Sequence, residues 1–411
     1  MKNYIDFYTK LDRHIVYLLI AEFFLQFINS SFFLLLNYYF DAIGLEDYQI
    51  ADLVSYRFLA VMLFAFPLGF FIKGKKVKPF FLLATVMVPT FALIIIFSAQ
   101  YHYYTLLKAA MVLWGVGFTF IQITALPFML LNTSSDKHSE SITAFFQTWS
   151  ISIFICGIVS AFLLEYVSMY FDEKILLLIF SFLGYTAIYF ILKIDIQEKV
   201  TQRIPWKKLA GHHDWGRIIM VCIPTFIIAI GAGFTIPFIN LFFLNVHGIG
   251  TSVFSILGSI TYALVAVGMV MIPNIRRRYG YEIAITFIQT LSILALVLMA
   301  TTEWYTEMAF AVYIAVTFYI IRQPLMNMAG PMTSELSMYY VGDKNHELVS
   351  ALNASIWSGS WFISGQIFRV LRAQDFAYVN IFLITAGLYA VGVIWYYFLI
   401  RDFNKQKMQL T

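Results

Sequence analysis

Long apolar runs separated by short polar links dominate the pattern of this 411-residue sequence. A bilayer core about 30 Å thick requires about 20 consecutive apolar residues in a helix. Twelve runs reach that length. The pattern therefore predicts an all-α integral membrane protein with twelve transmembrane helices, at residues 14–39, 48–72, 79–99, 104–131, 142–167, 175–194, 217–245, 251–273, 281–300, 307–331, 347–371 and 376–400.

The longest polar link lies between the sixth and seventh apolar runs. It extends over about residues 195–216 and contains acidic, basic and histidine side chains. We therefore expect an N-terminal six-helix bundle at 1–194, a cytoplasmic central loop at 195–216 and a C-terminal six-helix bundle at 217–411.

The distribution of lysine and arginine predicts the orientation of the chain. Cytoplasmic loops of membrane proteins carry an excess of these residues. With the N-terminus inside, 21 of the 27 basic residues fall in cytoplasmic segments, four fall outside and two fall within the runs. Both termini are therefore expected to be cytoplasmic.

The composition agrees with this pattern and excludes several classes of protein. The chain is 61% apolar and only 12% charged, whereas soluble domains are about 45–50% apolar and about 25% charged. A water-soluble enzyme, a disordered protein and a nucleic-acid binder are excluded. The first apolar run is too long for a cleaved signal, so we expect it to stay as the first membrane helix.

Short glycine-containing and basic segments stand at characteristic places along the chain, and the basic loops after the second and eighth runs occupy corresponding places in the two halves. Residues 69–78 read Gly-Phe-Phe-Ile-Lys-Gly-Lys-Lys-Val-Lys after the second run, and residues 278–280 read Arg-Tyr-Gly after the eighth. The fourth run contains Gly-Val-Gly at 115–117, and the seventh contains Gly-Ala-Gly-Phe at 231–234. With twelve runs and a long central loop, the whole chain resembles the major facilitator superfamily, in particular its drug- and sugar-export-like branch.

The resemblance is not complete. Lys73 stands where the loop motif of the family has an aspartate, and Met111 stands where helix four often has an arginine. The proline-glycine antiporter motif of helix five is absent around Gly157. These departures affect the loop contacts and the direction of transport that the family would imply.

The resemblance implies a fold of two six-helix halves that alternate in access around a central site. It also implies that the basic loops latch the halves on the cytoplasmic side. The same loops can instead act only as topology signals, or can bind anionic lipid headgroups. The candidate cytoplasmic gate residues are Gly69, Lys73, Lys76, Arg276, Arg278 and Gly280.

Three charged residues lie deep in the predicted spans, namely Glu22, Arg57 and Arg322. A charge near the bilayer centre costs about 2.5–3.5 kcal/mol on insertion scales, so these residues are functional candidates. Glu22 shares one helical face with Gln26 and Asn29, at i+4 and i+7, and these two amides are expected to bind the substrate. Burial disfavours its ionised form, so this carboxyl is expected to load and release a proton. The alternative is a structural hydrogen bond to a neighbouring helix.

Arg322 lies at a depth similar to that of Glu22 in the tenth span. In the resembled fold, helices one, four, seven and ten line the central cavity. The planar guanidinium suits a carboxylate or phosphate, so an anionic substrate could compete with Glu22 for Arg322. The alternative is a permanent ion pair between the halves. Arg57 contacts the substrate or pairs across a helix interface.

Several uncharged polar residues and one tryptophan in the spans are expected to line the substrate site. They stand in otherwise apolar helices, where small polar side chains can also serve only helix packing. These candidates are Gln122, Gln147, Asn240, Asn327, Asn353 and Trp357.

No pattern typical of a membrane enzyme is present. The seven histidines show no paired metal-ligand spacing, and the only close pair, His212 and His213, lies in the expected central loop. Phosphate-binding loops, redox cysteine pairs and nucleophile elbows are absent from the sequence. We expect no enzyme, no metal and no cofactor.

The sequence thus predicts a secondary active transporter in the cell (plasma or inner) membrane. A small organic anion or zwitterion is the favoured substrate, with protons as the driving ion and Glu22 as their carrier. The expected partners are the solute, protons and membrane lipids, without nucleic acid, and the chain is expected to be a monomer. The alternatives are an exporter of drugs or other lipophilic compounds and a non-transporting receptor or scaffold.

Overall fold

The computed structural model describes residues 11–72, 75–134, 138–196, 198, 214–342 and 345–410. All secondary structure in these residues is helical. Contacts group the chain into two compact units. The first consists of Met1–Leu45 and Tyr56–Trp206, and the second of Glu46–Ser55 and Lys207–Thr411. Most of the expected central loop, residues 197 and 199–213, lies outside the described residues, and the domain limits stay a prediction.

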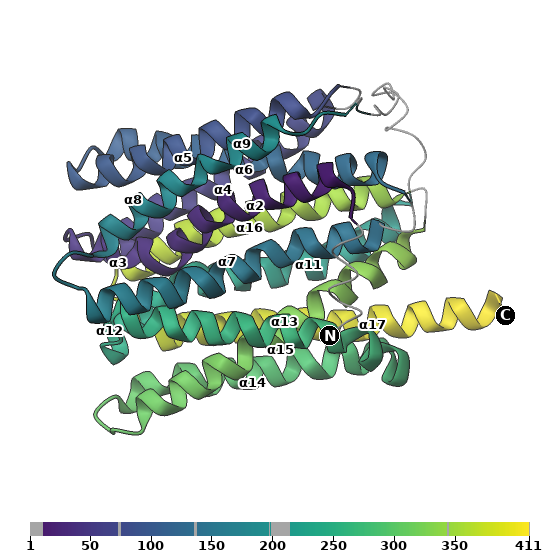
Figure 1. Cartoon of the computed structure of the whole chain (residues 1–411). Coiled ribbons are helices and arrows are strands. Elements are labelled where there is room, and N and C mark those ends of the chain that lie inside the picture. The colour runs from purple at the N-terminus through teal and green to yellow at the C-terminus, as the bar shows by residue number, and fades with distance from the viewer. Residues whose placement is uncertain are drawn as a thin grey trace. The chain divides into compact units, whose positions relative to one another are not determined.

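Helices of the first unit are joined by short links. A π-helical turn, η1 (Phe32–Leu36), connects the first two helical segments, and the first nine residues of α4 belong to the second unit. The helices are α2 (Arg13–Ser31), α3 (Asn37–Ala42), α4 (Asp47–Ile72), α5 (Lys78–Gln100), α6 (Tyr104–Asn132), α7 (His138–Tyr166), α8 (Glu173–Gly184) and α9 (Thr186–Leu192). In this unit α2 packs against α7, α8 and α9, and α5 lies beside α6 (Figure 1).

The second unit has the longest helices. Three short irregular turns interrupt them, at η3 (Ile236–Phe238), η4 (Glu282–Phe287) and η5 (Thr301–Tyr305). The helices are α11 (Trp215–Thr235), α12 (Ile239–His247), α13 (Thr251–Tyr281), α14 (Ile288–Ala300), α15 (Ala311–Val341), α16 (His346–Arg372) and α17 (Tyr378–Leu410). Here α11 packs against α16 and α17, and α15 packs against α13 and α14 (Figure 1).

Ten helical stretches of the described residues are long and apolar enough to cross a membrane. The stretches α15 and α16, which carry more polar residues, are not among them. The all-helical membrane fold is therefore confirmed, whereas the number of twelve crossings and the cytoplasmic position of both termini stay predictions.

Three helices extend beyond the apolar runs that predicted them. α13 continues past residue 273 to Tyr281, α15 past 331 to Val341, and α17 past 400 to Leu410. Hydropathy reports only the segment that can lie in hydrocarbon, while backbone hydrogen bonds continue the helix into water. These helices are therefore longer than the predicted spans, and the span limits at 273, 331 and 400 stay predictions.

Candidate functional site

A chain of side-chain hydrogen bonds runs along one face of α2 in the first unit. Nε2 of Gln26 donates to Oε1 of Glu22 at 2.6 Å. Nδ2 of Asn29 donates to Oε1 of Gln26 at 3.0 Å. All three side chains are buried, and Oε2 of Glu22 has no hydrogen-bond partner in the described part of the chain. The spacing of four and then three residues puts the three groups in contact on one helical face.

Arg57 of α4 ends this chain. Its Nη2 donates to Oδ1 of Asn29 at 2.6 Å. The guanidinium carbon lies 4.4 Å from the ring centroid of Trp114 on α6, a distance typical of a cation–π contact. Gly115 permits this approach, because a Cβ there would lie 2.4 Å from the carbonyl oxygen of Arg57. The structure therefore joins Glu22, Gln26, Asn29 and Arg57 into one polar network.

Arg322 of α15 has a different environment. The side chain is fully buried in the second unit, and Nη1 donates to Oε1 of Gln323 at 2.7 Å. Its Nε and Nη2 have no hydrogen-bond partner among the described residues. The phenols of Tyr319 and Tyr389 lie near enough to interact with it electrostatically, and the Tyr389 hydroxyl is close to the guanidinium without meeting the geometry of a full hydrogen bond. Two donors of a buried cation are thus available to a ligand.

The remaining predicted substrate residues lie on α6, α7, α12, α15 and α16. Gln122 on α6 is exposed, and Gln147 on α7 is half-buried. Asn240 on α12 is buried, and its Oδ1 accepts from the backbone N–H of Leu241 at 3.0 Å.

Asn327, Asn353 and Trp357 make local contacts or remain exposed. Nδ2 of Asn327 donates to the carbonyl of Gln323 at 2.8 Å, within α15. Asn353 is half-buried on α16, and Trp357 on the same helix is exposed. The ring of Trp357 lies edge-on to Trp361 with centroids 6.3 Å apart.

The candidate gate residues occupy two loop regions. Gly69 lies in the last turns of α4, Lys76 is exposed between α4 and α5, and Lys73 lies outside the described residues. In the second unit Nη1 of Arg276 lies 2.8 Å from Oε1 of Glu335 on α15.

Gly280 ends the regular part of α13. It adopts a φ of 75°, which favours glycine because it has no Cβ. A pocket of about 550 Å³ is present at this turn. It is lined by Arg276, Arg277, Tyr279, Gly280, Tyr281, Glu282, Phe403 and Asn404.

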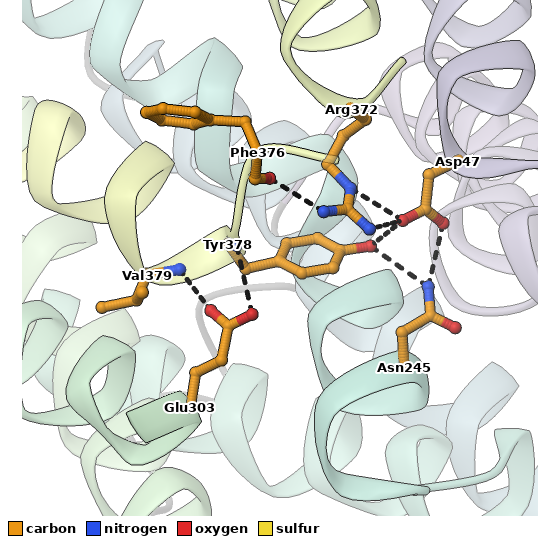
Figure 2. A network of polar contacts seen from close by, with 7 residues as sticks. All are labelled: Asp47, Asn245, Glu303, Arg372, Phe376, Tyr378 and Val379. Carbon is orange, nitrogen blue, oxygen red and sulfur yellow. Dashed lines mark hydrogen bonds and ion pairs between the residues drawn. The ribbon is translucent and has the colours of Figure 1, made fainter. Parts of the chain in front are cut away.

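A third polar cluster, within the second unit, was not predicted from the sequence (Figure 2). Oδ2 of Asp47 lies 2.9 Å from Nη2 of Arg372, and it also accepts from the hydroxyl of Tyr378. Nδ2 of Asn245 donates to Oδ1 of Asp47 at 2.9 Å. Oδ1 of Asp52, on the same short segment, lies 3.3 Å from Nη1 of Arg369.

The charged residues of this cluster are visible in the sequence, but their pairing depends on which helices pack together. Asp47 and Asp52 lie in the first two turns of α4, while Arg369 and Arg372 lie in the last turn of α16, where a spacing of three residues puts them on one helical face. Glu303 adds to the same region, since its carboxylate accepts from the backbone N–H groups of Tyr378 and Val379 at the start of α17 (Figure 2). A carboxylate there also complements the helix dipole.

The apolar helices and their few buried charges define a multi-pass membrane protein of the transporter type. The family model of the Major Facilitator Superfamily matches residues 18–365. The chain belongs to the Major Facilitator Superfamily. It is therefore a transporter of the cell membrane and not an enzyme. No curated protein matches the sequence significantly.

Solved transporters share the fold at low sequence identity. The POT family transporter PepTSo is 10% identical, with a TM-score of 0.77 over 97% of this chain and 99% of that chain. A bacterial homologue of the iron transporter ferroportin, in an inward-facing state, is 10% identical, with a TM-score of 0.72 over 95% and 99%. The nucleoside transporter NupG is 15% identical, with a TM-score of 0.68 over 94% and 98%.

Proposed function

We propose that this transporter moves a small organic anion or zwitterion by alternating access, and that proton movement drives it. Arg322 binds the anionic group of the solute, and Glu22 carries the proton. The single observation that supports this proposal most strongly is the state of Arg322, which is fully buried with two guanidinium nitrogens unbonded within the described residues.

A buried cation with unused donors is costly for a fold. Burying a charge without a partner carries a desolvation penalty of several kcal/mol, and a neutral side chain of similar size would avoid it. Arginine presents its donors in a planar fork that matches carboxylate and phosphate. The cost is understandable if Arg322 is paired during part of the transport cycle by a ligand with two acceptor oxygens.

Glu22 has the properties expected of a proton carrier. Its side chain is buried, one oxygen accepts from Gln26, and the other has no partner in the described chain. A carboxyl in such a place can change its protonation state without breaking a salt bridge. Its removal from water also makes each change in charge energetically large.

The balance of charge within the helices favours an anion over a lipophilic cation. Two arginines and one glutamate lie deep in the spans, so the net charge of these three residues is +1, or +2 when Glu22 is protonated. Both values repel a cationic solute. The solved transporters do not fix the solute, because a nucleoside transporter, a homologue of an iron transporter and a peptide transporter share the fold.

Thermal unfolding of the purified protein against a panel of metabolites and drugs tests the proposal. A ligand at 100 times its dissociation constant adds about 2.7 kcal/mol of stability. We expect organic anions to raise the unfolding temperature, and Arg322→Gln to abolish the shift. The exposed Arg277 supplies a matched control, because Arg277→Gln should retain it. Shifts only with lipophilic cations would contradict the proposal and favour drug export. Full transport by Arg322→Gln and Glu22→Gln variants would contradict any role of these charges.

A further inference from the structure

The network in the first unit has a fixed direction. Arg57 can only donate hydrogen bonds, and an ionised carboxylate such as Glu22 can only accept them. Between these two ends, each amide must turn its oxygen toward Arg57 and its NH₂ toward Glu22. The structure has this order, from Nη2 of Arg57 through Asn29 and Gln26 to Oε1 of Glu22.

Protonation of Glu22 changes one end of the network, because this side chain then no longer acts only as an acceptor. A carboxylic acid can donate, and the other oxygen, Oε2, makes no hydrogen bond in the described chain. The proton is satisfied if Gln26 turns its oxygen toward Glu22. The NH₂ group of Gln26 then faces Asn29, which must turn its own oxygen toward Gln26.

The reversal ends in a conflict at Arg57. With Asn29 turned, its NH₂ group faces the guanidinium, and two donors meet where a hydrogen bond of 2.6 Å existed. Arg57 loses its acceptor while Trp114 still stacks on it. The Arg57 residue as a whole is half-buried, in contrast to the fully buried Arg322. It can therefore exchange Asn29 for an oxygen of an approaching anion.

We propose that Glu22, Gln26, Asn29 and Arg57 form a proton-controlled switch, in which proton uptake by Glu22 reverses the two amides and frees Arg57 for the anionic group of the solute. The proton comes from the aqueous phase, and no covalent bond other than its O–H bond forms or breaks. Gln26 and Asn29 are positioning residues of this switch. The identity of the ligand rests on the proposed anion transport. The coupling between protonation of Glu22 and the hydrogen bond of Arg57 does not depend on it.

Other charges do not control Glu22 in the described structure. The helices packed against α2 are α5, α6, α7, α8 and α9. Burial and the bond from Gln26 are the two influences on the Glu22 carboxyl. The described charged side chains of those helices lie near helix ends, at Lys78, Lys108, Glu165, Glu173 and Lys174.

The coupling predicted by the switch is positive in both directions. If a proton on Glu22 frees Arg57, an anion on Arg57 must favour protonation of Glu22 by the same factor. Proton and anion then bind together, which is the requirement for co-transport in one direction.

Infrared difference spectroscopy between acidic and alkaline pH tests the link without any solute. The protein contains isotope-labelled arginine, so the guanidinium bands are distinguished from the background. Glu22→Gln assigns the carboxyl band and Arg57→Lys assigns the guanidinium band. We expect the wild type to show both changes together, and Glu22→Gln to lose both. Gln26→Met and Asn29→Leu should keep the carboxyl band and lose the guanidinium shift.

Two controls keep the result specific. Gln289→Met changes a buried amide of α14 in the second unit and should alter neither band. Gln26→Met and Asn29→Leu break different bonds, so either one suffices if the other does not fold. The proposal is overturned if the guanidinium band is constant while Glu22 titrates, or if its shift persists in the variant that folds. It is also overturned if no Glu22 carboxyl band appears at any pH at which the protein stays folded.

The anion panel separates this inference from the proposed function. Linked bands without any anion-induced thermal shift would retain the switch and reject the substrate class. Anion binding that depends on Arg322 without linked bands would retain the substrate class and reject the switch.

Discussion

Two arginines in the membrane helices have opposite environments. Arg57, in the first unit, donates to Asn29, stacks on Trp114 and remains partly exposed. Arg322, in the second unit, is fully buried, donates through Nη1 to the neighbouring Gln323, and leaves two nitrogens unbonded among the described residues. The residue type is the same. The guanidinium of Arg57 has an amide and an aromatic ring as partners, whereas that of Arg322 has a single hydrogen bond to its neighbour among the described residues.

The difference indicates two roles in binding. An arginine that donates to a side-chain amide loses this hydrogen bond when the amide rotates and presents its NH₂ group instead of its oxygen. A protonation event at the other end of the network can cause that rotation. An arginine with unused donors needs no release and gains most when an anion supplies acceptors. We therefore propose that Arg57 controls anion binding and that Arg322 supplies the affinity.

The largest effect is expected for Arg322→Met. Loss of the fork removes the charge-assisted bonds to the anion, so transport should fall on the order of 100-fold. The unfolding temperature should rise, because a buried cation without a carboxylate in the described structure is replaced by an apolar side chain. Transport assays in proteoliposomes and thermal unfolding measure the two effects. A variant that is both less stable and active would show that Arg322 only supports the fold.

A third arginine sharpens the comparison, because Arg372 has a carboxylate partner. Its side chain is 18% exposed and pairs with Asp47, so Asp47→Asn should lower the free energy of unfolding by about 2 kcal/mol. Asp52→Asn is the matched control, since its partner Arg369 is 42% exposed and the expected loss is below about 1 kcal/mol. Chemical denaturation measures both. Equal losses would contradict the dependence on burial.

Glu22→Gln tests the control assigned to Arg57. The wild type should bind anions more tightly at acidic than at alkaline pH, by at least about fivefold, because a protonated Glu22 frees Arg57. The variant imitates the protonated form and should bind equally at both. Anion titrations monitored by intrinsic fluorescence give the affinities. A wild-type affinity that does not change with pH would remove Glu22 from binding.

The smallest effect is expected for Gln122→Leu. Gln122 is exposed on α6. None of the hydrogen bonds described above joins it to Arg57 or to Arg322. Anion affinity should change by less than about twofold, as is usual for surface substitutions. The same binding titration measures it. A loss as large as that of Arg322→Met would place the anion site on α6 instead.

Much of the fold could be predicted from hydropathy alone, because a bilayer demands long apolar helices. Each predicted run coincides with helix in the structure, as for residues 104–131 and α6. The ends were less predictable. α15 continues ten residues past Pro331, since a proline late in a helix removes one backbone bond without stopping the remainder.

The candidate site could be predicted only where it lies along one helix. Glu22, Gln26 and Asn29 share a face by spacing, and the structure bonds them in that order. The addition of Arg57, and the pairing of Asp47 with Arg372, depend on which helices pack together. Periodicity reports the face of a helix but not its neighbour, so these bonds were beyond the sequence pattern.

Proton movement during anion uptake tests the central claim most directly. Proteoliposomes enclosing a pH indicator receive, from outside, the anion that most stabilises the purified protein, with protein-free vesicles as the control for passive permeation. Coupled entry should acidify the lumen in the wild type, and Glu22→Gln and Arg322→Gln should abolish the acidification. Anion entry through the wild type with no change in lumenal pH would contradict proton-coupled anion transport.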